Sequence, residues 1–468
     1  MKLRDKSVSA LTVVLAGIAL CAIQFFNPFL WFDESGQFFL GLGLNHYSDP
    51  YALRGTLQDV IVNNCAFNLD PGGFTVMTYF WTFVSTSVLF LRVLPFIFFA
   101  ASVYLLYRIL DHIGASKSYS VIFLGVYLIF ASVFFLVAEF RAYSMEICGT
   151  LLTLLLYLKY SGNFTYKRLL VLSLVACFFC TSRYASILVA FVLTLFVLWE
   201  LYRKEEFRTF IVKSMVFGIP LAATVLCIYL FVTSRQDPDA MHYVAYIGKT
   251  PSLLLSPLVL LIYLNAALLV FRHKKENDIP FILCFSLSVS ILFIGLSACS
   301  LFPWDAKRAA SMTLLNLVSL MVHFDYFAKA LSGKKWVIFA LDAAIIVCSA
   351  GLCYKLIHRG KDDIAKEFEA LDLSKYENVF ISYESMPDVK YQYEFGRLKD
   401  RVESDSYPDK FVFQCKLEPG PDGLDELVVT EPQDVDCDLY FNIRPPENDL
   451  FVLEDGCRHS YKKTSSRR

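Results

Sequence analysis

Long apolar runs alternate with short loops that carry Lys and Arg, from the start of the chain to about Ile357. The runs are roughly 18 to 22 residues long, which is the length that an α-helix needs to cross a bilayer. The composition agrees, because 56% of the 468 residues are hydrophobic and only 19% are charged. The pattern predicts an α-helical polytopic membrane protein, and it points to no nucleic-acid partner.

Hydropathy predicts about eleven transmembrane helices. The predicted spans are Val8–Phe29, Arg92–Leu110, Tyr119–Val137, Tyr143–Leu158, Leu169–Cys180, Ala185–Leu201, Phe210–Phe231, Leu253–Phe271, Ile279–Ser300, Ala309–Phe327 and Trp336–Leu356.

The distribution of basic residues predicts the orientation of these helices. With a cytoplasmic N-terminus, the Lys and Arg clusters fall in cytoplasmic loops throughout, as the positive-inside rule requires. The apolar segment Phe74–Leu91 would invert every later loop if it crossed the membrane, so we interpret it as a re-entrant or interfacial helix. The odd number of crossings places the C-terminus outside. We therefore predict a multi-pass protein of a bacterial inner (cytoplasmic) membrane, with an extracytoplasmic C-terminal domain.

The chain divides into three parts by composition. Residues 1–356 form the predicted transmembrane domain, in which residues 31–91 are the first outer loop. Residues 357–459 are polar, with short strands and helices between Pro, Gly and Asp turns, and predict a small α/β or α+β domain. Residues 460–468 are basic and rich in Ser, and we expect them to be disordered. Four cysteines fall on the predicted outer side, where a disulfide is expected; its connectivity stays open. They are Cys65, Cys415, Cys437 and Cys457.

An acidic pair, Asp33-Glu34, directly follows the first predicted helix. Ionisable residues at the edge of a membrane span are candidates for function. The alternative is a helix cap or a solvated loop. Trp31 and Phe32 are typical of residues that anchor a chain at the membrane interface, and this favours a fixed position for the pair. Polar candidates for substrate contact also lie on the outer side, namely His46, Tyr47, Asp70 and Tyr143.

Several basic residues lie near helix ends on the predicted outer side, where the charge bias disfavours them. Arginine offers paired hydrogen bonds to phosphate oxygens, so these positions predict a site for a phosphate or pyrophosphate. The alternative for each is a snorkelling anchor or a local ion pair, for example with Glu139 or Asp305. The candidates are Arg92, Arg141, Arg183, Lys307 and Arg308.

The order of these motifs resembles the GT-C class of integral-membrane glycosyltransferases, in particular protein O-mannosyltransferases, the lipid A aminoarabinose transferase and bacterial relatives that use dolichyl-phosphate-mannose. The stretches that carry the resemblance are Phe32-Asp33-Glu34, Leu91–Pro95 with Tyr104–Arg108, Glu139–Tyr143, Lys307-Arg308, and Val379–Glu384 with Lys390–Tyr393. One departure is Leu69–Gly73, where relatives often carry a His-Pro-Pro phrase.

The resemblance implies that Asp33 is the catalytic base, that Glu34 is its companion, and that the arginines hold the phosphate of the donor. The implied enzyme is an inverting hexosyl- or pentosyltransferase with a polyprenyl-phosphate-sugar donor and a glycolipid, polysaccharide or protein acceptor. The cofactor prediction stays open between none and a divalent cation, Mg²⁺ or Mn²⁺.

Two other functions are compatible with a polytopic chain. A transporter or flippase of a lipid-linked or anionic substrate is the main alternative, although carriers place their charges near the bilayer midplane and show related halves. This chain instead gathers unusual charges at one predicted face and shows no repeated halves. A non-catalytic membrane scaffold would need no acidic pair.

Overall fold

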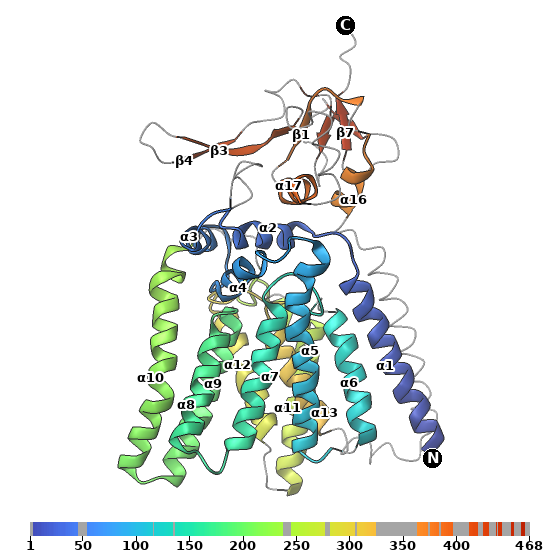
Figure 1. The fold of residues 1–468 in the computed structure, drawn as a ribbon. Coiled ribbons are helices and arrows are strands. Elements are labelled where there is room, and N and C mark those ends of the chain that lie inside the picture. The colour runs from blue at the N-terminus through green and yellow to red at the C-terminus, as the bar shows by residue number, and fades with distance from the viewer. Residues whose placement is uncertain are drawn as a thin grey trace. The chain divides into compact units, whose positions relative to one another are not determined.

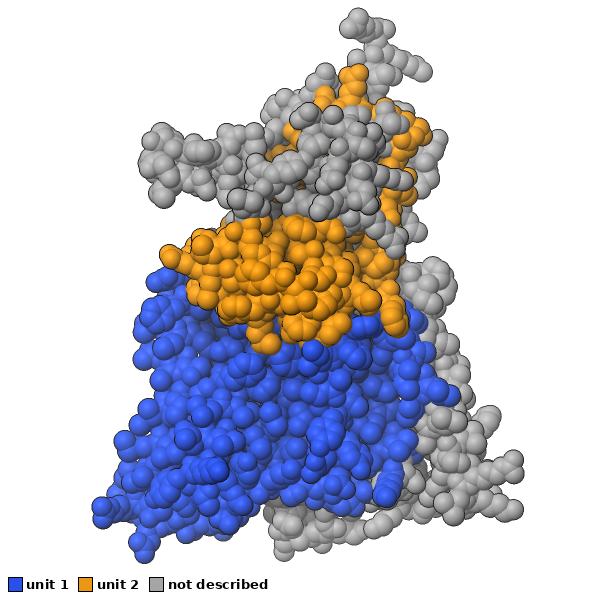
Figure 2. Space-filling model, in the orientation of Figure 1, with its two compact units in different colours: residues 1–25, 68–74, 95–356 blue, residues 26–67, 75–94, 357–468 orange. Residues whose placement is uncertain are grey.

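The computed structural model divides the chain into two compact units, which Figure 2 colours separately. The helical unit comprises Met1–Phe25, Asn68–Phe74 and Pro95–Leu356, and the mixed unit comprises Phe26–Phe67, Thr75–Leu94 and Ile357–Arg468. The structure describes residues 3–44, 54–115, 117–133, 136–236, 245–276, 281–304, 307–323, 363–372, 375–382, 385–395, 411–419, 425–429, 437, 439–441, 451–453 and 460–463.

The helical unit is a bundle of long apolar helices (Figure 1). Its described helices are α1 (Leu3–Phe25), most of α5 (Val88–His112), α6 (Lys117–Val133), α7 (Tyr143–Tyr160), α8 (Tyr166–Cys180), α9 (Tyr184–Lys204), α10 (Phe207–Phe231), α11 (Pro257–Glu276), α12 (Phe281–Ala298) and α13 (Ala310–Val322), with 3₁₀ turns η1 (Thr233–Arg235) and η3 (Pro251–Leu255).

Helices α1 and α6 approach closely because glycines lie at their contact. A Cβ atom added to Gly17 would lie 2.5 Å from Leu128, and one added to Gly125 would lie 2.7 Å from Val13. Small residues that allow two backbones to approach are typical of helix contacts within membranes, where packing drives helix association.

Among the described residues, four helices are long and apolar enough to cross a membrane: Val88–His112, Tyr184–Lys204, Phe207–Arg235 and Phe281–Ala298. Shorter apolar helices occur at Val13–Phe25, Ser120–Val133, Leu258–Val270 and Ala310–Val322. The helical membrane class is thus confirmed, whereas the count of eleven stays a prediction. The predicted span Trp336–Leu356 lies outside the described residues.

The ambiguous segment Phe74–Leu91 forms no continuous helix. Helix α4 (Gly73–Trp81) has 9 residues, and a turn separates it from Val88, where α5 begins. A helix of this length is about 14 Å long, less than half of a hydrocarbon core of about 30 Å. The segment therefore cannot cross a bilayer as one span, although its side of the membrane stays a prediction.

The orientation of the chain is open to a direct test. We expect alkaline phosphatase, fused after Arg468, to be active in a bacterial host, because the basic loops predict an extracytoplasmic C-terminus. A green fluorescent protein fused at the same position should be dark, and its fluorescence beside an inactive but stable phosphatase fusion would reverse the orientation.

The mixed unit combines the first loop with the C-terminal domain. Its helices are α2 (Phe32–Gly41), α3 (Leu57–Phe67), most of α4, the first turns of α5, α16 (Asp363–Ala370) and α17 (Met386–Glu394). Its strands are β1 (Val379–Ile381), β2 (Phe411–Phe413), β3 (Cys415–Pro419), β4 (Asp425–Val429), β5 (Leu439–Phe441), β6 (Phe451–Leu453) and β7 (Ser460–Lys463).

The sheet of this unit has the order β2-β1-β5-β7-β6, and β3 and β4 form a separate antiparallel pair. Strand β1 is parallel to β2 and β5, while β7 is antiparallel to β5 and β6. Parallel neighbours need a crossover, and α17 lies in the connection from β1 to β2. This mixed sheet confirms the predicted small domain of strands and helices.

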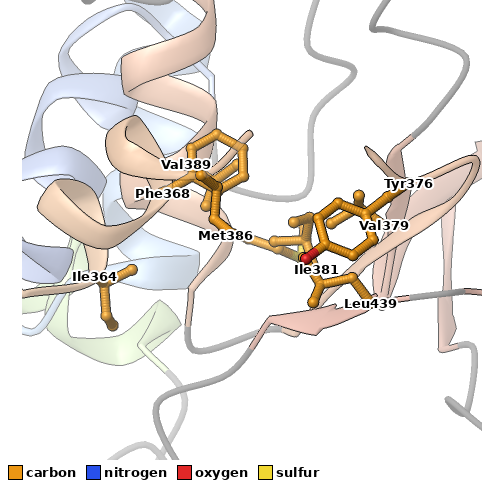
Figure 3. Close-up of a cluster of buried hydrophobic side chains, with 9 residues drawn as sticks. Ile364, Phe368, Tyr376, Val379, Ile381, Met386, Val389 and Leu439 are labelled. Atoms are coloured by element: carbon orange, nitrogen blue, oxygen red, sulfur yellow. The ribbon is translucent and has the colours of Figure 1, made fainter. Parts of the chain in front are cut away.

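Strand β1 is buried on both faces of the sheet. Val379 and Ile381 face a cluster that includes Phe368 and Met386, shown in Figure 3. Phe380 points to the opposite face, where it packs with Tyr440, Tyr461 and Cys437. This alternation follows from the two-residue period of a strand.

One prediction about this part of the chain needs correction, whereas the predicted domain boundaries stay predictions. Most of the described residues between 31 and 91 belong to the same compact unit as the C-terminal residues. The disordered segment predicted from Ser460 is wrong for Ser460–Lys463, because these residues form β7 and pair with two strands. Residues 464–468 lie outside the described part.

The predicted disulfide stays a prediction. Among the cysteines whose side chains are described, which include Cys65 and Cys437, no two form a disulfide. The side chain of Cys415 and all of Cys457 lie outside the described residues.

Candidate functional site

The acidic pair lies in the first turn of α2. A helix N-terminus favours carboxylates because its peptide dipoles place partial positive charge there. Glu34 reaches back to its own helix start, where its Oε2 accepts a hydrogen bond from the Trp31 backbone N–H at 3.3 Å. The loop that sequence analysis placed here is therefore a helix, and Glu34 stabilises its beginning.

Glu34 also forms a buried ion pair with Arg92 of α5. The Arg92 Nη2 atom lies 3.2 Å from the Glu34 Oε2 atom, and the two side chains are 2% and 1% exposed. The same Nη2 donates to the backbone oxygen of Phe29 at 2.7 Å. Because a buried ion pair holds both partners in one geometry, Arg92 joins α5 to the start of α2.

Asp33 differs from Glu34 in its exposure. Its side chain is partly exposed, whereas Glu34 is buried. Consecutive residues of a helix point about 100° apart, so the two carboxylates face different directions. Of this pair, Asp33 is therefore the more exposed residue.

A buried chain of hydrogen bonds supports α2 from behind. The Gln37 amide donates to the Thr75 hydroxyl at 3.0 Å, and that hydroxyl donates to the Asn64 side chain at 2.7 Å. These three residues come from α2, α4 and α3, and all are buried. The network fixes the helix that carries the acidic pair against its neighbours.

A second group of charges lies at helix ends within the helical unit. The carboxylate of Asp70 lies 3.4 Å from Arg183 Nη1 and 3.8 Å from Arg141 Nη2. Arg183 also contacts Glu146 of α7, with its Nε 3.1 Å from Oε2. Three segments that are distant in sequence thus meet through alternating charges.

Tyr143, at the first position of α7, lies close to two cations of this group. The Arg183 guanidinium lies 4.1 Å and the Lys307 ammonium 5.0 Å from the centre of its ring, within the range of cation–π attraction. Lys307 also pairs with Glu139. The Ser311 hydroxyl donates to Glu146. We call these residues the basic cluster, which comprises Asp70, Glu139, Arg141, Tyr143, Glu146, Arg183, Lys307 and Ser311.

Backbone contacts hold the turn that carries Asp70. The side-chain amide of Gln236 donates from its Nε2 atom to the backbone carbonyl oxygens of Asn68 and Asp70, at 2.8 and 3.4 Å. The Gly73 N–H donates to the Thr181 carbonyl at 2.8 Å. A Cβ atom at Gly73 would lie 2.1 Å from the Thr181 hydroxyl oxygen, so the close approach requires glycine.

The cations of the cluster differ in their access to solvent. The side chain of Arg183 is 7% exposed, compared with 17% for Arg141 and 15% for Lys307. Burial alone lowers the pKa of Arg183, but the Asp70 carboxylate, Tyr143 and Glu146 outweigh it and raise that pKa above its ordinary value. Arg183 is therefore a buried permanent charge, while Arg141 and Lys307 are the accessible donors.

The structure brings together Asp33, Glu34 and Arg92 in the mixed unit, and five predicted site residues in or beside the basic cluster of the helical unit. The latter are Asp70, Arg141, Tyr143, Arg183 and Lys307, and Arg308 follows directly in the chain. His46 and Tyr47 lie outside the described residues, as does Asp305.

Sequence analysis missed Glu146 and Ser311. Glu146 lies in the apolar segment that we predicted as the span Tyr143–Leu158, and a carboxylate in such a segment was a signal in its own right. Its neighbours could not be read from the sequence, because Arg183 and Ser311 follow far along the chain. Glu139 pairs with Lys307, a non-local partner, although Arg141 was the partner expected from local sequence.

The described residues contain no group of three or more His, Cys, Asp or Glu side chains placed to hold a metal ion. The carboxylates of the basic cluster each face a Lys or Arg. Mg²⁺ and Mn²⁺ need several oxygen ligands together, and the carboxylates of the basic cluster are not arranged in this way. The choice between no cofactor and a divalent cation stays a prediction.

Comparisons with known proteins add a distant similarity. No protein-family model matches the sequence, and no curated protein matches it either. The oligosaccharyltransferase of Archaeoglobus fulgidus, in a crystal structure with Zn and sulfate, is similar over 82% of this chain and 61% of its own, with a TM-score of 0.42 and 10% identity. The same enzyme tethered to an acceptor peptide with an NVT sequon matches over 84% and 63%, with a TM-score of 0.44 and 11% identity.

The oligosaccharyltransferase AglB from Archaeoglobus fulgidus, in complex with an inhibitory peptide and a dolichol-phosphate, matches over 93% of this chain and 75% of its own. Its TM-score is 0.44 and its identity 11%. The chain covers less than two thirds of the first two structures. These neighbours are GT-C class membrane glycosyltransferases, the class that the sequence motifs resemble. A likeness this distant assigns no activity and no residue roles to this chain.

Proposed function

We propose that the chain is a membrane glycosyltransferase that moves a sugar from a polyprenyl-phosphate donor to a hydroxyl group of a glycolipid, polysaccharide or protein on the extracytoplasmic face. The observation that carries this proposal is the contrast within the acidic pair. Glu34 is buried and bound to Arg92, whereas Asp33, in the same helical turn, is partly exposed. A fixed helix start that presents one accessible carboxylate is suited to a general base.

In the proposed reaction, Asp33 accepts the proton of the acceptor hydroxyl as its oxygen attacks the anomeric carbon of the sugar. The bond between that carbon and the donor phosphate oxygen breaks, and the lipid leaves as a phosphate monoester. A single displacement of this kind inverts the anomeric centre. The leaving phosphate gains negative charge, which cationic side chains can stabilise.

Glu34 and Arg92 act as a positioning pair in this proposal. Both Glu34 contacts, to Trp31 N–H and to Arg92, hold the first turn of α2. Arg92 is 1% exposed and donates to Phe29 as well as to Glu34. We therefore propose that Arg92 positions α2. Sequence analysis had suggested that it contacts the donor phosphate directly.

The basic cluster is the proposed site for the donor phosphate. Arg141 and Lys307 are its accessible cations, and the Arg141 contact with Asp70 is long, at 3.8 Å. A phosphate can therefore compete for the Arg141 guanidinium and gain charge-assisted hydrogen bonds. Arg183 is more buried and joins Asp70 to Glu146, so it organises the cluster from behind.

The experiment that tests the function supplies purified protein with a panel of radiolabelled polyprenyl-phosphate sugars and a membrane extract. Transfer of label from one donor to an extractable or polymeric product is the expected result. Uptake of a labelled donor into vesicles without any transfer would instead support the transporter alternative.

Removal of an accessible cation should weaken donor binding. We expect Arg141→Ala to raise the KM for the donor by about tenfold or more, because a hydrogen bond to a charged group contributes roughly 1.5–3 kcal/mol. Arg141→Lys should restore only part of the affinity, since lysine cannot make a paired contact. Steady-state transfer at varied donor concentration measures both.

The matched control for this prediction is Arg168→Ala. Arg168 is a partly exposed arginine in α8 that donates to the Asn163 carbonyl and lies outside the basic cluster. The Arg168→Ala substitution should leave the donor KM unchanged. Equal effects of Arg141→Ala and Arg168→Ala would contradict the assignment of Arg141 to the donor.

A further inference from the structure

Aromatic side chains of the C-terminal domain pack directly on α2. The Tyr391 ring of α17 lies 5.1 Å from the Phe38 ring at an interplanar angle of 90°. Phe395, which follows α17, lies 4.9 Å from Phe38 and 6.3 Å from Phe39. Edge-to-face pairs at these distances are specific in geometry, so α17 is packed on one face of α2 in a defined arrangement (Figure 1).

The contacted face of α2 is the face that carries Glu34. Residues four apart lie on the same side of a helix, so Phe38 lies one turn after Glu34 on the same face of α2. Phe38 and Tyr391 are buried, at 0% and 1% exposure. The aromatic contact therefore continues the buried strip on which Glu34 meets Arg92.

Tyr391 makes a second contact at the start of α5. Its hydroxyl donates to the Thr86 carbonyl at 2.8 Å, two residues before α5 begins at Val88. Burial raises the pKa of the Tyr391 hydroxyl, the Arg92 guanidinium opposes that rise, and the Glu34 carboxylate adds to it. Tyr391 thus lies within electrostatic reach of the buried ion pair.

A third contact comes from α16 of the same domain. The Lys366 ammonium lies 5.9 Å from the centre of the Phe29 ring. Phe29 supplies the carbonyl to which Arg92 donates. The C-terminal domain therefore touches the segment before α2, the helix itself and the segment before α5.

We propose that Tyr391 and Phe395 are positioning residues through which the C-terminal domain fixes the start of α2 and so aims the carboxylate of Asp33. The catalytic meaning of this inference depends on the proposed function, whereas the mechanical link does not. In this proposal the C-terminal domain positions the catalytic helix, although neither Tyr391 nor Phe395 takes part in the chemistry.

Hydrogen–deuterium exchange of the full-length protein in lipid nanodiscs tests the link without any assay of transfer. Tyr391→Phe keeps the ring but removes the hydroxyl that binds Thr86. We expect amide exchange in Phe32–Gly41 to accelerate about fivefold, as loss of one buried hydrogen bond predicts. Phe395→Leu, which removes the ring contacts and keeps an apolar side chain, should accelerate exchange in the same peptide.

The matched control is Tyr461→Phe. Tyr461 is a buried tyrosine of the same domain that packs with Phe380 and Tyr440 in the sheet. The Tyr461→Phe substitution should leave amide exchange in α2 unchanged. Unchanged exchange in both Tyr391→Phe and Phe395→Leu, or an equal rise in Tyr461→Phe, would overturn the proposal.

Transfer kinetics test the catalytic part. Tyr391→Phe should lower kcat, expressed per molecule of folded protein, several-fold and leave the donor KM unchanged. Partial unfolding would also lower the apparent kcat at an unchanged KM, so the folded fraction of each variant is measured by size-exclusion chromatography and used to normalise kcat. Faster exchange in α2 with unchanged kcat would overturn the aiming of Asp33. Faster exchange in a protein whose wild type transfers no sugar would preserve the link and refute the proposed function alone.

Discussion

An Asp33→Asn protein should transfer sugar about a hundredfold more slowly than the wild type, or slower still, because acid–base groups usually contribute factors of this size. Asparagine keeps the size and the hydrogen-bonding capacity of aspartate but cannot accept the proton of the acceptor hydroxyl. Binding of the donor should survive, since the lost interaction matters mainly in the transition state. Single-turnover transfer and equilibrium donor binding measure the two effects separately.

Glu34→Gln is the matched control for this result. A glutamine at this position retains an oxygen that can accept from the Trp31 N–H and from Arg92, so α2 keeps its start. The variant removes a charge beside Arg92 and should therefore lower the stability of the protein more than its turnover. We expect a milder kinetic defect than that of Asp33→Asn.

An Asp33→Asn protein that folds, binds donor and transfers sugar at the normal rate would contradict the assignment of the base. A stronger kinetic defect in Glu34→Gln than in Asp33→Asn would reverse the roles within the pair. Loss of donor binding in Asp33→Asn would show that this carboxylate holds the substrate and does not act mainly on the proton.

The sequence allowed the acidic pair to be singled out, but it could not assign the two roles. Both carboxylates follow the same apolar run, and local sequence treats them alike. Their difference arises from Arg92, which lies 58 residues further along the chain and buries Glu34. Contacts at such separation depend on how helices pack, which hydrophobic periodicity alone does not encode.

The cations of the basic cluster could also be predicted from the sequence, but their partners could not. Arg141, Arg183 and Lys307 could be predicted as unusual, because basic residues violate the charge bias of outer loops. Their partners could not, since Asp70 and Arg183 are 113 residues apart. Strand β7 was missed for a related reason: Ser460–Lys463 looks polar and basic by itself, and only pairing with β5 and β6 makes it a strand.

Removal of Arg183 should cause the largest loss of stability among the variants considered. Its guanidinium pairs with Asp70 and Glu146 while its side chain is 7% exposed. Arg183→Ala leaves two buried carboxylates without that cation, and breaking a buried pair in this way costs about 3–5 kcal/mol. Equilibrium unfolding in mixed detergent micelles measures the free energy, with Arg141→Ala as the more exposed control from the same cluster.

A second substitution distinguishes an ionic network from simple packing. Because the pKa of Arg183 is raised, its charge persists at any pH at which the protein can be handled, so mutation rather than titration must remove it. Glu146→Gln, added to Arg183→Ala, removes one stranded charge and should recover part of the lost stability, a coupling of roughly 0.5–3 kcal/mol. If the two substitutions are instead additive, Arg183 stabilises the helix ends through its contact with the Tyr143 ring, and the charges of the cluster contribute little to the fold.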